Sequence, residues 1–99
     1  MDSLCSINLS KELKPKERYS FLEAKSFALD GFGIIHYDRN EYEKAIGYFS
    51  QSLEVMAELG DTHGIYSTLE TIGISHYELG DYDKAIEYQI QCLKIWKVF

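Results

Sequence analysis

The chain has 99 residues, of which 45% are hydrophobic and 26% are charged, as expected for one small globular domain. Its net charge of −6 argues against nucleic acids and anionic membranes as partners, because both select basic surfaces. Cys5 and Cys92 lie far apart without metal-ligand spacing, which favours a cytoplasmic protein over a disulfide framework. The N-terminus lacks a secretory pattern, and no apolar stretch approaches the roughly 20 residues of a membrane span.

Residues 1–14 form the first predicted segment, a weak helix that packs as half a unit on the helix after it. The alternative is a frayed terminus. The segment has four apolar residues at helical spacing: Leu4, Ile7, Leu9 and Leu13. Pro15 suits the first turn of a second helix, which is predicted to run to about Tyr37.

From this helix onward the sequence repeats itself after forty residues. Residues 33–37 and 42–53 return as residues 73–77 and 82–93, with eleven of the shared positions identical in both copies: Gly33, Ile34, His36, Tyr37, Tyr42, Lys44, Ala45, Ile46, Tyr48, Gln51 and Leu53. Such a period indicates stacked helical units. Stacked units present a long surface and no single deep pocket, which favours binding over chemistry.

Each unit is predicted to be a pair of helices. The second helix of the first unit, residues 41–58, has an apolar stripe at three- and four-residue steps, and the stripe returns in the second unit with Gln89 in place of Phe49. Short joints separate the helices: Asn40-Glu41, Gly60-Asp61 and Gly80-Asp81. Glycine and asparagine accept positive φ, and aspartate caps the following helix.

Two glycines inside the predicted first helices need a reason. Gly33 and Gly73 occupy the same position of the repeat, where each costs about 1 kcal/mol relative to alanine. Their register predicts that a neighbouring helix packs too closely for a β-carbon. Ala45 and Ala85 are the expected small residues on the opposing helices.

The residues Leu69-x-x-Ile72-Gly73 and the run from Gly80 to Tyr88 (GDYDKAIEY) resemble the tetratricopeptide repeat in its forty-residue variant. The resemblance extends from about Lys25 to the end of the chain, with departures at four positions: Asn40, Ser52, Gln89 and Cys92. It implies an all-α fold in which antiparallel helix pairs stack into a right-handed superhelix. The expected domain covers residues 15–99, with one unit at about 21–59 and a second at about 61–99.

The resemblance also implies that the first helix of each unit lines a concave face that binds a protein or peptide. Carried onto this sequence, the candidate residues are Phe27, Asp30, Ile34, Tyr37, Asp38, Ser67, Glu70, Ile74, Tyr77 and Glu78. The four carboxylates among them favour a basic or amphipathic segment over an acidic peptide end. The alternative interpretation is a solvated helix face without a partner.

The last predicted helix is apolar at Leu93, Trp96, Val98 and Phe99 and has no polar cap, which predicts a homodimer or a longer stack, including helix exchange between copies. The competing hypothesis is that the chain is part of a longer array. No catalytic, metal or phosphate-binding pattern is present, so we predict no enzymatic activity and no cofactor. His36 and His76 are interpreted as packing residues. The leading function is protein binding, with self-association and sensing of a signalling peptide as alternatives.

Overall fold

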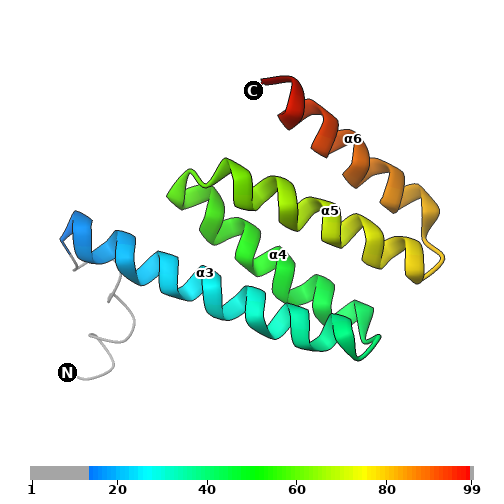
Figure 1. Cartoon of the computed structure of the whole chain (residues 1–99), viewed down its shortest axis with the longest axis horizontal. Coiled ribbons are helices and arrows are strands. Elements are labelled where there is room, and N and C mark those ends of the chain that lie inside the picture. The colour runs from blue at the N-terminus through cyan, green and yellow to red at the C-terminus, as the bar shows by residue number, and fades with distance from the viewer. Residues whose placement is uncertain (1–13, 99) are drawn as a thin grey trace.

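The computed structural model describes residues 14–98, and the side chains of residues 14–95. This part of the chain forms four helices: α3 (Pro15–Asp38), α4 (Tyr42–Leu59), α5 (Thr62–Glu78) and α6 (Tyr82–Val98). Each helix packs on its neighbour in sequence, and α3 and α6 lie at opposite edges (Figure 1). No strand occurs within residues 14–98. The predicted all-α stack of two helix pairs is confirmed, whereas the weak helix predicted at the N-terminus lies outside the described residues.

The joints between helices have the predicted backbone conformation. Asn40, Gly60 and Gly80 have φ angles of 63°, 71° and 82°. This left-handed conformation turns the chain back at each joint. At Gly80 the backbone amide also donates a hydrogen bond to the Tyr77 carbonyl oxygen at 3.0 Å, and this bond satisfies one of the last acceptors of α5. Asp61 caps α5 as predicted, because its carboxylate accepts a hydrogen bond from the Gly64 amide at 3.0 Å.

The two units meet in one part of the core. Ile72 of α5 forms one buried cluster with Ala45 and Phe49 of α4. Four partly buried side chains pack against this cluster: Tyr37, Ile46, Leu53 and Tyr88. The two helix pairs are therefore joined by side chains from α4 and α5, and neither pair encloses this cluster alone.

The close helix packing predicted at the two interior glycines is confirmed. A β-carbon on Gly33 would lie 2.6 Å from Cε1 of Phe49, and one on Gly73 would lie 3.2 Å from Cβ of Tyr88. At Gly73 the predicted neighbour Ala85 contributes only its carbonyl oxygen, at an ordinary contact distance of 3.6 Å, and Tyr88 is closer. At Gly33 the three nearest atoms all belong to the Phe49 ring, so the prediction that Ala45 is the small residue opposite this glycine is wrong.

Two departures from the family pattern make the same contact in both units. The Ser52 hydroxyl donates to the Ser26 carbonyl oxygen at 3.3 Å, and the Cys92 thiol lies 3.7 Å from the Tyr66 carbonyl oxygen. Both side chains belong to buried residues. Each small polar group thus links the second helix of its unit to the first.

The two repeated histidines pack within their own units. His36 stacks on Tyr48 and His76 stacks on Tyr88, with ring centroids 5.3 and 5.4 Å apart. The Nδ1 atom of His36 lies 2.9 Å from a Glu41 oxygen at the joint. Each imidazole ring therefore packs between the two helices of its own unit, in agreement with the packing interpretation. Residues 14–98 contain no group of three or more His, Cys, Asp or Glu side chains that could hold a metal ion.

The contact at Gly33 leads to a stability prediction. We expect Gly33→Ala to lower the free energy of unfolding by about 1–3 kcal/mol, because the new methyl group displaces the buried Phe49 ring. Gly47→Ala is the matched control, since a β-carbon there meets nothing within 4 Å on an exposed part of α4. It should stabilise the protein by up to about 1 kcal/mol through helix propensity. Urea unfolding measures both changes, and stabilisation by both variants would contradict the packing account.

Candidate functional site

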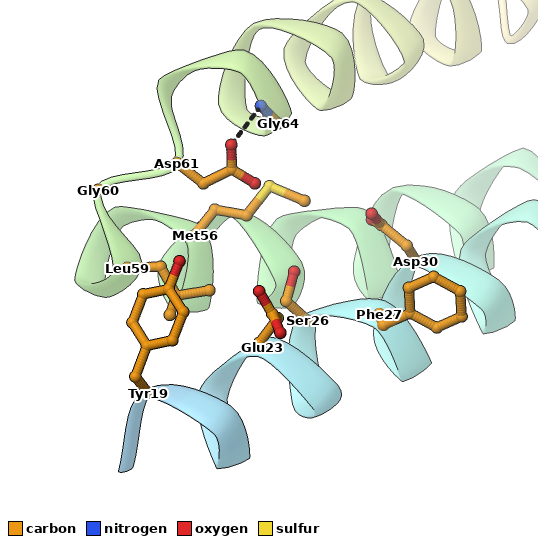
Figure 2. A pocket seen from close by; sticks show the side chains of 10 residues that line it. All are labelled: Tyr19, Glu23, Ser26, Phe27, Asp30, Met56, Leu59, Gly60, Asp61 and Gly64. Carbon is orange, nitrogen blue, oxygen red and sulfur yellow. Dashed lines mark hydrogen bonds between the residues drawn. The ribbon is translucent and has the colours of Figure 1, made fainter. Parts of the chain in front are cut away.

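A pocket of about 410 Å³ lies between α3 and the joint that connects α4 to α5 (Figure 2). One wall is a single face of α3, because four residues recur at three- and four-residue steps: Tyr19, Glu23, Phe27 and Asp30. Ser26 lies beside them, and the other wall consists of Met56, Leu59, Gly60, Asp61 and Gly64. The pocket is therefore formed by both units and the joint between them.

The joint places an acidic side chain opposite α3. Gly60 takes its positive φ and turns the chain, and Asp61 then folds back onto the start of α5 to accept the Gly64 amide (Figure 2). Glycine is required at position 64 for a steric reason. A β-carbon there would collide with the Asp61 carboxylate and lie 3.1 Å from the Met56 sulfur.

The pocket is acidic. Glu23, Asp30 and Asp61 line it, and none of its ten lining residues is basic. The Oδ1 atom of Asp30 is buried and has no hydrogen-bond partner among the described residues. Burial raises the pKa of Asp30, a hydrogen bond between its carboxylate and the Ser52 side chain lowers it, and the negative charge of Asp61 raises it. The pocket thus holds a carboxyl group whose charge is poorly compensated.

Two exposed aromatic rings stand at the same pocket. The side chain of Phe27 is 83% exposed, and that of Tyr19 is 54% exposed. Aromatic faces and carboxylates both attract cations. The arrangement is therefore suited to a positively charged group attached to an apolar stem, such as a lysine or arginine side chain.

Of the ten residues predicted for the concave face, the structure brings two into this pocket, Phe27 and Asp30. Further along α3, Ile34 and Asp38 are exposed, while Tyr37 is half-buried and packs edge-on against Tyr42 with ring centroids 5.5 Å apart. All five candidates on α5 are exposed: Ser67, Glu70, Ile74, Tyr77 and Glu78.

Sequence reasoning missed eight of the ten residues that line this pocket, including Tyr19, Glu23 and Asp61. Tyr19 and Glu23 lie eight and four residues before Phe27, so helical spacing could have found them. Asp61 was interpreted only as a helix cap, and no local signal places its carboxylate opposite α3.

A second pocket, of about 370 Å³, lies between α5 and α6 and is lined by Ile74, Tyr77, Tyr82, Ala85, Ile86 and Gln89. Among the residues predicted for self-association, Leu93 is 59% exposed on α6. The side chains of Trp96 and Val98, and all of Phe99, lie outside the described residues. This second pocket is mainly apolar, in contrast to the acidic pocket beside α3.

Residues 25–97 match the family model of the tetratricopeptide repeat, and the match covers well over half of the chain. The chain therefore belongs to the tetratricopeptide repeat family, whose repeats mediate protein–protein interaction. No curated protein and no solved structure matches the chain. In the described part of the chain, no helix is both long and apolar enough to cross a membrane.

The environment of Asp30 leads to a prediction about pH. Because its pKa is raised in the fold, the folded protein binds a proton more tightly there than the unfolded chain does. This group therefore favours folding below its ordinary pKa of 3.8, and the benefit is lost as the pH rises through the raised value. Asp30→Asn should raise the melting temperature at pH 7, and its advantage over the original protein should disappear below pH 3.8.

Glu54→Gln is the control for this measurement, because it removes an exposed carboxylate from α4. Its effect should stay within about 0.5 kcal/mol. Melting curves of the three proteins across the pH range test the account. A lower melting temperature for Asp30→Asn at pH 7 would contradict it.

Proposed function

We propose that the domain binds a basic or amphipathic segment of another protein on the face formed by α3 and α5, with a lysine or arginine side chain entering the acidic pocket. The observation that supports this most directly is the buried Oδ1 atom of Asp30, which has no hydrogen-bond partner within the described residues. A buried polar atom without a partner costs about 1–3 kcal/mol. A cationic ligand group in the pocket would compensate the charge of this carboxylate.

The shape of the pocket supports the same ligand chemistry. A lysine or arginine stem is apolar and contacts aromatic and thioether groups well, and Phe27, Tyr19 and Met56 provide them. The charged end would then lie between Glu23, Asp30 and Asp61, of which Asp30 is partly buried and the other two are exposed. Attraction between charges is stronger at the partly buried Asp30 than at a fully exposed carboxylate.

The remainder of the face supports an amphipathic segment. Asp38, Glu70 and Glu78 are exposed acids along α3 and α5, and Ile34 and Ile74 are exposed apolar side chains on the same two helices. A segment with alternating basic and apolar residues would match both kinds of group. An acidic peptide end would meet repulsion from these carboxylates.

Panning of random phage-displayed peptides on the whole chain tests this function. We expect enrichment of lysine or arginine flanked by apolar residues. Titration of a selected peptide against Glu23→Gln/Asp30→Asn should show affinity at least about tenfold weaker, because charged hydrogen bonds contribute about 1.5–3 kcal/mol each. Affinity should also fall as salt is added.

Glu54→Gln/Glu87→Gln is the matched control, because it removes the same charge from exposed sites on α4 and α6. Its affinity for the peptide should be nearly unchanged. Selection of acidic or uncharged peptides would contradict the proposal, and so would equal losses in the two double variants.

Self-association is the second candidate function. It is favoured by the exposed apolar side chains of α6, which include Ile86, Ile90 and Leu93. Contiguous exposed apolar surface is typical of interaction sites.

We place both activities in the cytoplasm. The chain has only two cysteines, and Cys92 is buried. Burial raises the pKa of its thiol, and the charge of Glu70 raises it further. A protonated, buried thiol fits a packing role in a reducing compartment.

A further inference from the structure

The forty-residue repeat allows each exposed position to be compared with its own duplicate. On α4, Ile46 and Leu53 are partly buried and pack against the cluster that contains Ile72 of α5. Their duplicates on α6, Ile86 and Leu93, are 57% and 59% exposed. The face of α6 that corresponds to the α5-binding face of α4 therefore has no cover from the described residues.

At the opposite edge of the molecule, residues that are buried on α5 have exposed duplicates on α3. Thr68, Ile72 and Ser75 form the buried face of α5, and Ile72 is 0% exposed. Their duplicates on α3 are Ala28, Phe32 and Ile35, and all three are exposed. This edge of α3 is thus an α5-like face that has no α4-like helix against it within residues 14–98.

Side-chain size on the two uncovered faces differs from that at the interface between α4 and α5, and the difference on one face offsets the difference on the other. Inside the molecule, Ile72 packs with Phe49. At the position of Phe49, α6 has the smaller, more flexible Gln89, which lines the apolar pocket of about 370 Å³. At the position of Ile72, α3 has the larger Phe32. The larger Phe32 on the α3 face therefore corresponds to the extra space beside Gln89 on the α6 face. The combined side-chain volume of these two positions is roughly that of Ile72 and Phe49 inside the molecule, as a packed interface requires.

We propose that α3 of one copy docks on α6 of a second copy in the way that α5 docks on α4, with Phe32 entering the pocket beside Gln89. This inference rests on the self-association candidate and specifies its geometry. The two surfaces in contact are different, so the association is head-to-tail and each added copy exposes a new α6 face. Because each contact between copies repeats the packing of α5 on α4, the α3 and α5 faces of successive copies form one continuous binding surface.

Two blocked variants test the geometry. Ile86→Glu places a charge on the α6 face and leaves the α3 face intact, whereas Phe32→Glu does the reverse. Ile86 and Phe32 are 57% and 52% exposed in the single chain, so circular dichroism should be unchanged in both variants. The unfolding midpoint should fall somewhat for Phe32→Glu, because this change also removes the ring contact with Tyr48, whose centroid lies 5.5 Å away. Ile90→Glu and Ile35→Glu provide a second pair at neighbouring exposed positions in case either of the first variants fails to fold.

Light scattering after size exclusion measures the mass from micromolar to millimolar concentrations. The original chain should rise above two copies, and each blocked variant should remain a single chain. An equimolar mixture of Ile86→Glu and Phe32→Glu should form a complex of two chains and nothing larger, because one intact α3 face meets one intact α6 face. Glu54→Arg, on another exposed part of α4, should assemble like the original chain.

Two results would overturn the proposal in different ways. If the original chain stays a single copy at every concentration, self-association itself fails. This is also the result expected when residues 1–13 or a further repeat of another protein cover these faces. If Phe32→Glu still forms dimers while Ile86→Glu does not, the copies associate through α6 alone, and only the head-to-tail geometry fails.

Discussion

The packing of Ile72 against Ala45 and Phe49 is the contact on which the arrangement of this protein depends. A helix pair of this size cannot bury its apolar face alone, and this cluster is where the second pair covers the first. Gly33 allows the Phe49 ring to lie close to α3, which gives the cluster its compact shape. The position of α5 relative to α3 follows from this interface, and the joint that leads into α5 forms part of the acidic pocket.

The acidic pocket combines local geometry with an electrostatic cost. The turn at Gly60 and the cap made by Asp61 are ordinary means of starting a helix, yet they place a carboxylate opposite α3. Asp30 is partly buried near it, with one oxygen unpartnered within the described residues, and its pKa is raised. A group that opposes folding at neutral pH is typical of a functional site, where stability is given up for binding.

The repeat has a further consequence at the two edges of the molecule. The same kind of side chain is partly buried between the units and exposed outside them, as Ile46 and Ile86 illustrate. Burial here is a property of position in the stack and not of residue type. An apolar stripe in a repeat sequence therefore predicts a contact surface, but only the arrangement of the helices shows which of its copies has no neighbour.

The sequence by itself determined the helices, their joints and the close approach at Gly33 and Gly73. These features depend on helical periodicity and on φ angles, which act over a few residues. Only the tertiary structure decided that Glu23, Asp30 and Asp61 line one pocket and that Tyr37 is half-buried beside Tyr42. The pocket forms because α3 packs on α4 and the joint after α4 carries Asp61, which brings together side chains far apart in the chain. Tyr37 and Tyr42 are close in the chain and meet because the joint between α3 and α4 turns the chain back.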